Sequence, residues 1–210
     1  MKRSRWHVLI FIVMLSLSFA AQDAEIPSDD RPASATATAA KFNFPAPYQI
    51  RIAGQEEIER MLKTHGADVL VVNFWATWCP PCIEELPYFV EAAREYEDKG
   101  VQFVGLSGDF LDQVEQKTPP FLKKQKIFYP NLALDVIPAK FIPFISEHWD
   151  GVFPATVLYD ARGRKISEYL KALTKDELRQ AVDEALKSVK GDADQPSAST
   201  GAEISPVEEP

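Results

Sequence analysis

The chain has 210 residues, enough for one domain with tails, and it carries 31 acidic against 23 basic residues, a formal net charge of −8. This acidic balance argues against nucleic acid or an anionic lipid surface as a partner. Only two cysteines and three histidines are present, a poor supply for a zinc site of about four ligands. We therefore expect no metal and no other cofactor.

Residues 1–20 have the pattern of a secretory signal peptide. A basic start at Met1–Arg5 precedes an apolar run from Val8 to Ala21, and Ser18–Ala20 fits a cleavage site with small residues. An uncleaved membrane anchor is the alternative, although the run is shorter than the roughly 20 apolar residues that span a bilayer. We expect export, to the periplasm or otherwise out of the cytoplasm. Cleavage would remove three basic residues and no acid, leaving a net charge of −11.

Two segments are too polar to bury a core. Residues 21–42 are rich in Ala, Ser, Thr, Pro and Asp, and residues 191–210 contain five acids, three prolines and no basic residue. Both compositions are typical of disorder. The sequence thus predicts a disordered linker at 21–42, one folded domain at 43–190 and a disordered acidic tail at 191–210.

The folded part begins with a helix and a buried strand. Gln55–His65 is expected to be helical, because its apolar residues recur on one face. Asp68–Phe74 is a mostly apolar run, as expected of a strand in the centre of a sheet.

A CxxC motif follows this strand. Cys79 would lie at the N-terminus of the next helix, where unpaired N–H groups and the helix dipole favour its reactive thiolate. Cys82 lies one turn later and could resolve a mixed disulfide formed on Cys79. Pro80 and Pro81 are tolerated in a first helical turn. A structural disulfide is the alternative, but one that closes so short a loop would stabilise little.

Alternating strands and helices after the motif predict an α/β domain with some parallel pairing. Trp149 is expected to be a packed aromatic, or else part of the site's rim, and His148 a surface residue. The expected elements are a helix at Cys82–Lys99 kinked by Pro87, a strand at Val101–Leu106, a helix at Asp112–Lys126 interrupted by Pro119 and Pro120, and a helix at Lys140–Trp149.

The C-terminal part contains two local signals. Asp160–Ile166 is expected to form a hairpin turn in which Gly163 supplies a positive φ. Thr174–Glu177 is a capping box, and the apolar stripe that follows predicts a helix covering one face of the sheet.

Two runs resemble a known family. Val71–Pro87 is similar to the VNFWATWCxPCxxExP stretch of the TlpA/ResA-like thiol-disulfide oxidoreductases of the thioredoxin superfamily, and Phe153–Asp160 resembles their cis-proline segment. The likeness extends over about residues 43–190. It implies an α/β thioredoxin fold, a central mixed sheet flanked by helices. It also implies an extra strand–helix insertion before the cis-proline strand, since Phe128–Asp135 resembles the family's inserted strand.

The resemblance also implies roles for individual residues. Cys79 and Cys82 would be catalytic. Pro154 would be cis and lie beside Cys79, and the backbone of Phe153 would pair with a substrate strand. The expected supporting residues are Trp78, Pro80, Pro81, Glu85 and Pro154.

Proton handling near Cys82 is open at this point. Ordinary thioredoxins have a buried Asp where this chain has Asn73, which does not titrate. Glu85, three residues after Cys82 and on the same helical face, could take over that role. The alternative is that Glu85 is an exposed first-turn acid that stabilises the helix dipole.

The function expected from this resemblance is the reduction of protein disulfides outside the cytoplasm, with a membrane protein as electron donor. Pro80 and Pro81 donate no charge, and Glu84 and Glu85 would disfavour a thiolate, which favours a reductase. The alternatives are a disulfide oxidase or isomerase, or a redox-inert binding module. A peroxiredoxin-type peroxidase is disfavoured, because Ala76 stands where its TxxC signature would have Thr.

Overall fold

The computed structural model describes residues 41–136 and 138–193. The signal peptide and the predicted linker up to residue 40 lie outside the described residues, as does the tail from residue 194. Among the helices that are described, none has both the length and the apolar character needed to cross a bilayer.

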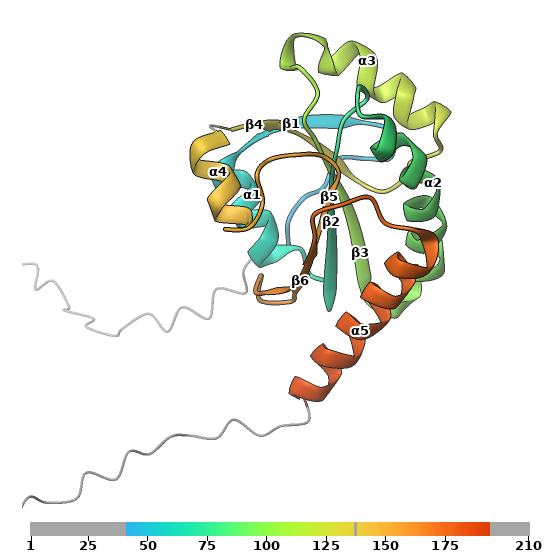
Figure 1. Ribbon diagram of the computed structural model, residues 1–210, viewed down its shortest axis with the longest axis vertical. Helices are drawn as coiled ribbons and strands as arrows, with labels where there is room; N and C mark the ends of the chain where they lie inside the picture. The colour runs from blue at the N-terminus through green and yellow to red at the C-terminus, as the bar shows by residue number, and fades with distance from the viewer. Residues whose placement is uncertain (1–40, 137, 194–210) are drawn as a thin grey trace, which may run out of the picture. The chain divides into compact units, whose positions relative to one another are not determined.

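The fold is a six-stranded mixed sheet with helices on both faces (Figure 1). The strand order is β1-β4-β3-β2-β5-β6, with parallel pairing from β1 to β2 and antiparallel pairing of β5 with β2 and β6. The strands are β1 (Ile50–Gly54), β2 (Val69–Trp75), β3 (Val101–Ser107), β4 (Asn131–Asp135), β5 (Ala155–Asp160) and β6 (Lys165–Tyr169). The predicted mixed sheet flanked by helices is confirmed.

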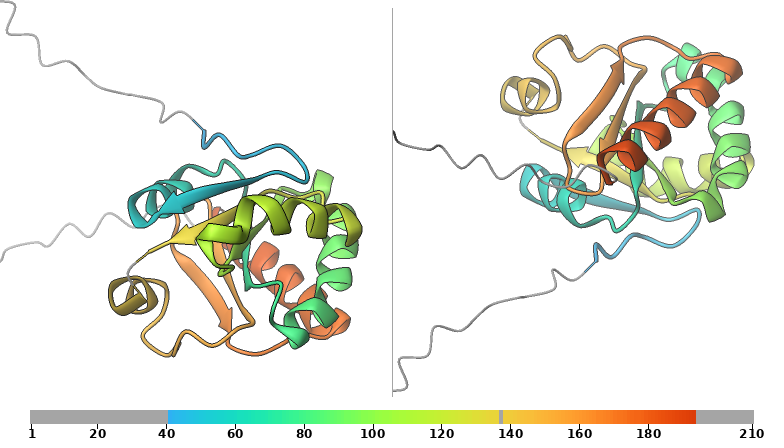
Figure 2. Two further views of the ribbon diagram at one scale, coloured as in Figure 1. Left: turned by 90° about the horizontal axis from the view of Figure 1, so that it is seen from above. Right: turned by 90° about the horizontal axis from the view of Figure 1, so that it is seen from below.

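The helices divide between the two faces of the sheet (Figure 2). Helices α2 and α5, with buried residues of α3, pack on the face that carries Val69 and Val71 of β2. Helices α1 and α4 pack on the other face, against Leu70, Val72 and Phe74. The helices are α1 (Gln55–Thr64), α2 (Pro80–Glu95), α3 (Leu111–Lys124), α4 (Pro138–Ile145) and α5 (Lys175–Ala193), with a 3-10 turn at Glu97–Lys99.

Strand β2 is central because both of its faces are apolar. All seven of its residues are buried, and successive side chains alternate between the two cores. Asn73 is the polar residue of this strand, and it is buried. A buried amide needs hydrogen-bond partners, and those of Asn73 are described with the site below.

The structure corrects two helix predictions. The expected interruption of α3 at Pro119 and Pro120 is wrong, because the helix continues to Lys124. Burial of Thr118 and Leu122 on the same helix outweighs the lost backbone hydrogen bonds. Helix α4 starts at Pro138 and ends at Ile145, so Trp149 lies in the following loop instead of in the expected helix.

The ends of the described fold differ slightly from the expected positions. Phe42 is buried in the α1/α4 core, and its N–H donates to the carbonyl of Thr64, although the linker was expected to include it. Helix α5 continues to Ala193, three residues past the expected end at 190. Its start agrees with the predicted capping box, since Thr174 and Glu177 exchange hydrogen bonds.

The hairpin turn between β5 and β6 is confirmed. Gly163 has a φ of +75°, and the Asp160 carboxylate accepts hydrogen bonds from the backbone N–H groups of Arg162 and Arg164.

Candidate active site

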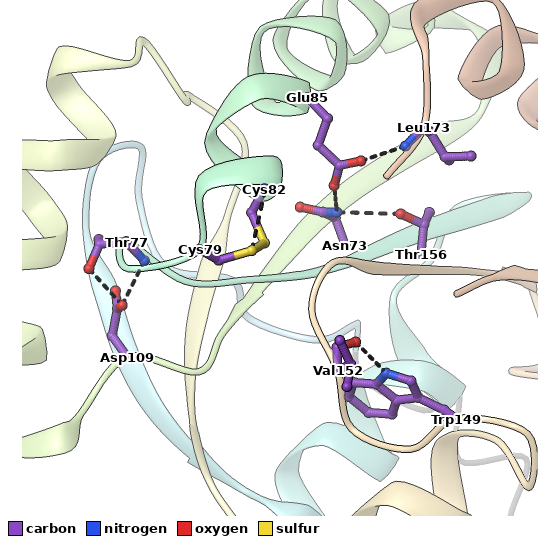
Figure 3. The surroundings of a disulfide bond; sticks show 10 residues. All are labelled: Asn73, Thr77, Cys79, Cys82, Glu85, Asp109, Trp149, Val152, Thr156 and Leu173. Carbon is purple, nitrogen blue, oxygen red and sulfur yellow. Dashed lines mark hydrogen bonds between the residues drawn. A yellow bond between two sulfur atoms is a disulfide. The ribbon is translucent and has the colours of Figure 1, made fainter. Parts of the chain in front are cut away.

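The two cysteines form a disulfide at the start of α2 (Figure 3). Strand β2 ends at Trp75, a short loop follows, and α2 begins at Pro80, so Cys79 is the N-cap residue. The Cα atoms of Cys79 and Cys82 are 5.3 Å apart, and the Cys82 N–H donates to Cys79 Sγ at 3.3 Å. The Cys82 N–H, which has no partner within the helix, thus points at the Cys79 sulfur, and this geometry stabilises a thiolate.

The two cysteines differ slightly in their exposure to solvent. Cys79 is 4 % exposed and Cys82 is fully buried. The partner of a disulfide exchange therefore has to reach Cys79 first.

In the reduced protein at neutral pH, we expect an alkylating reagent to modify Cys79 before Cys82. The reason is that Cys79 combines the greater access with the helix N-terminus, and the thiolate is the species that reacts. Mass spectrometry of peptides after a short iodoacetamide pulse gives the order. Preferential labelling of Cys82 would contradict the assignment.

A buried polar network lies behind the disulfide (Figure 3). Glu85 is 1 % exposed, so its interpretation as an exposed first-turn acid is wrong. Asn73 Nδ2 donates to Glu85 Oε1 at 2.9 Å, and the N–H of Leu173 donates to Glu85 Oε2 at 2.7 Å. Asn73 Nδ2 also lies 3.3 Å from Thr156 Oγ1.

Burial gives Glu85 an unusual acidity. Loss of solvation raises the pKa of Glu85 to about 7, even though the hydrogen bonds from Leu173 and Asn73 act in the opposite direction. Among the described residues, Asn73 Oδ1 accepts no hydrogen bond. In Figure 3 this oxygen points toward the disulfide. Asn73 thus lies between a carboxyl group that titrates near neutrality and the cysteine pair.

The segment before β5 reaches the same end of the sheet. The Phe153–Pro154 peptide bond is cis, as the resemblance implies. Ala155 pairs with Phe74 in the antiparallel β2/β5 ladder, which places Pro154 at the end of β2 from which the CxxC loop leaves. This register brings together segments about 75 residues apart in the sequence.

Phe153 and Trp78 form an aromatic surface beside the motif. Their ring centroids are 5.7 Å apart, and the Phe153 ring is 6.1 Å from that of Trp149. A Cβ atom on Gly108 would lie 2.3 Å from Phe153 Cε2, so only glycine leaves room for this ring. Trp149 is buried against Phe74, as expected, and His148 is exposed and bonded to Glu168.

Sequence reasoning missed Asp109. Its Oδ1 accepts hydrogen bonds from the N–H and the hydroxyl of Thr77, both at 2.8 Å, and its Oδ2 accepts from the buried Thr118 hydroxyl at 2.9 Å. Asp109 therefore joins the loop that carries Cys79 to helix α3 (Figure 3 shows its contact with Thr77). The signal available in the sequence was an acid that follows a strand and a glycine, but no local pattern indicates its hydrogen-bond partners.

Replacing Asp109 with Ala is expected to destabilise the protein by about 2–3 kcal/mol, because three donors lose their acceptor and each hydrogen bond contributes about 1 kcal/mol net. Urea unfolding of the oxidised protein measures the change. Glu115→Ala, an exposed acid on α3, is the control and should stay within about 0.5 kcal/mol of the parent. Equal effects of the two substitutions would contradict this role.

The chain is similar to several known proteins. A model of the AhpC/TSA family matches residues 38–182. Thiol-disulfide oxidoreductase ResA of Bacillus cereus is 32% identical over 107 residues, which cover 51% of this chain and 57% of ResA. ResA of Halalkalibacterium halodurans is 24% identical over 161 residues, covering 72% and 85% of the two chains. A thioredoxin-family thiol:disulfide interchange protein from Chlorobium tepidum has 28% identity and a TM-score of 0.47, over 58% of this chain and 81% of its own.

The mixed sheet, the disulfide at the start of α2 and the family match define a thioredoxin-like protein. The chain belongs to the AhpC/TSA family. Its match to the first of the curated relatives spans a little over half of that relative's length.

Proposed function

We propose that this protein is an exported thiol-disulfide oxidoreductase that reduces disulfide bonds in other proteins. The observation that carries the proposal is the Cys79–Cys82 disulfide at the N-terminus of α2, with Cys79 the slightly more exposed of the two buried cysteines. The similarity to proteins named thiol-disulfide oxidoreductase supports the reaction class. The signal-peptide pattern of residues 1–20 supports export, to a periplasm or an equivalent compartment.

The reaction starts from the reduced protein. The Cys79 thiolate attacks a substrate disulfide, so that a Cys79–substrate disulfide forms and the other substrate sulfur leaves as a thiolate. Cys82, deprotonated, then attacks the Cys79 sulfur, forms the Cys79–Cys82 disulfide and releases the second substrate sulfur. The substrate gains two electrons and two protons, and the protein loses the same number. A membrane dithiol protein is the proposed donor that restores the reduced form.

Glu85 is the proposed acceptor of the Cys82 proton. Asn73 does not titrate, whereas the pKa of Glu85 is raised to about 7, which suits a group that takes up and returns a proton near neutral pH. Asn73 donates to Glu85 and has a free oxygen facing the disulfide. Its amide could therefore bind the reduced Cys82 thiol and hold the carboxyl group in place.

The remaining site residues have positioning roles in this proposal. Pro80 and Pro81 stiffen the first turn of α2, where the backbone N–H that proline lacks would have no partner within the helix. Trp78 covers the surface beside Cys79, and Phe153 and Pro154 form the edge on which a substrate strand would pair.

We expect the Cys79–Cys82 couple to have a reducing potential, closer to the thioredoxin value of about −270 mV than to the about −120 mV of a strong oxidase. Two prolines between the cysteines supply no positive charge, and Glu84 and Glu85 disfavour an anionic sulfur. Equilibration with glutathione buffers of known ratio measures the potential.

Three measurements separate the alternatives and identify the substrates: the potential, the reactivity toward dithiothreitol and the trapping of substrates on Cys79. A potential above roughly −160 mV would identify an oxidase and contradict the proposed direction. A disulfide that resists dithiothreitol in the folded protein would indicate a redox-inert binding module. To identify substrates, a Cys82→Ser protein expressed in the envelope should retain them on Cys79 as mixed disulfides.

A further inference from the structure

An open hollow lies directly beside the candidate nucleophile. It has a volume of about 160 Å³ and is lined by Thr77, Trp78, Asp109, Phe110, Gln113 and Lys117. The residue before Cys79 forms one wall. The start of α3, a different element, forms the other.

Two of the residues that line this hollow have exposed aromatic rings. Phe110 is 67 % exposed and Trp78 is 52 % exposed, and their ring centroids are 6.3 Å apart. Phe110 is the residue before α3, and its side chain makes no capping hydrogen bond there. Two exposed aromatic rings that pack against each other beside a hollow indicate a contact surface for a ligand rather than part of the core.

Several of the polar groups that line the hollow are already engaged. Both Asp109 oxygens accept hydrogen bonds from Thr77 and Thr118, and the Lys117 ammonium donates to Gln113. A ligand group that enters the hollow therefore meets the two exposed rings and a carboxylate whose oxygens both accept hydrogen bonds. The two rings favour contact with an apolar side chain.

The volume and the chemistry of the proposed function together define the occupant. A cavity of about 150 Å³ with apolar walls is large enough to bind benzene, so this hollow can hold one aromatic side chain. The mixed disulfide on Cys79 necessarily brings the substrate chain over the adjoining Trp78. The occupant is therefore a side chain of the substrate polypeptide close to the attacked cysteine.

Resting on the proposed function, we infer that Trp78 and Phe110 form a subsite that selects protein substrates with an aromatic residue next to the reactive cysteine. Phe110 is the specificity-determining residue, since it supplies the ring that lies just before α3. An aromatic ring that packs against these two is stabilised by burial of apolar surface and by ring–ring contact.

The test uses the full-length Cys82→Ser protein in its reduced form and two peptide disulfides. Each peptide is a five-residue homodimer joined by its single cysteine, with Tyr or Ala beside the cysteine. The Cys79 thiolate forms a disulfide with one peptide and releases the other as a thiolate, which takes up a proton. Mass spectrometry of the intact protein gives the rate for each peptide.

We expect the Tyr peptide to react about tenfold faster than the Ala peptide, a preference typical of one aromatic contact. With Phe110→Ser added, the ratio of the two rates should fall to about two or less. Phe110→Tyr, which keeps the ring, should retain the preference. Phe144→Ser, which removes another exposed ring on α4, is the matched control and should also retain it.

The outcomes separate the subsite from the proposed function. If Cys79 reacts with neither peptide, the proposed function fails and this inference fails with it. If it reacts with both at equal rates, or if the preference survives in Phe110→Ser, the reaction stands and the subsite is wrong. Circular dichroism of each variant, together with its rate on the Ala peptide, checks that the fold is intact.

Discussion

Replacing Cys79 with Ser is expected to lower the rate of protein disulfide reduction by at least about a thousandfold, as loss of a covalent nucleophile does in other enzymes. A serine hydroxyl is not ionised near neutral pH and cannot form the mixed disulfide. Cys79 is also the sulfur that receives the N–H of Cys82 at the helix start. Reduction of insulin, with dithiothreitol as the electron source, is a suitable assay.

Cys82→Ser should fail differently. Its Cys79 still attacks, so one equivalent of substrate stays bound as a mixed disulfide, and turnover then depends on dithiothreitol alone. Both variants lack the disulfide, so the reduced parent is the proper control for stability. A mixed disulfide that accumulates on Cys82 in Cys79→Ser, with none on Cys79 in Cys82→Ser, would reverse the assigned roles.

Glu85→Gln is expected to remove a pH dependence of stability. The pKa of Glu85 is raised from 4.5 to about 7 in the folded protein, so the native state binds a proton more tightly than the unfolded state does. Glu85 therefore favours the fold most at low pH. Its contribution is lost as pH rises from about 4.5 through 7, by about 3 kcal/mol.

Urea unfolding of the oxidised protein at pH 4.5, 6 and 8 tests this expectation. The stability of the parent relative to Glu85→Gln should decrease across the series. Gln can keep both contacts if the Asn73 amide rotates, so the variant is expected to fold. Glu84→Gln, the exposed neighbouring acid, should follow the parent at every pH. Parallel curves for the parent and Glu85→Gln would show that Glu85 is an ordinary acid.

Local patterns in the sequence were sufficient to predict much of this fold. The apolar run of β2, the CxxC motif, the Gly163 turn and the Thr174 capping box each depend on neighbours within a few residues. The structure places all four as expected. Their physical causes are short-range: alternation of side chains, helix capping and a positive φ.

What sequence reasoning could not decide depends on distant contacts. Whether Glu85 is exposed or buried is settled by the Leu173 N–H, 88 residues away. The role of Asp109 depends on Thr77, 32 residues earlier, and on Thr118. The two prolines of α3 were interpreted by local propensity, whereas packing of that helix decided the outcome.

If the protein is exported as proposed, the bond between Leu173 and Glu85 also bears on the order in which the site is completed. A chain that leaves the membrane N-terminus first presents Cys79 and Cys82 well before Leu173 emerges. Until then, the Glu85 carboxylate lacks one of its two donors and the cover provided by α5. A nascent chain thus exposes its thiols in a compartment that can oxidise them, while its acid still titrates as it would in water. Glu85 acquires its raised pKa only after the C-terminal part of the chain has emerged and packed.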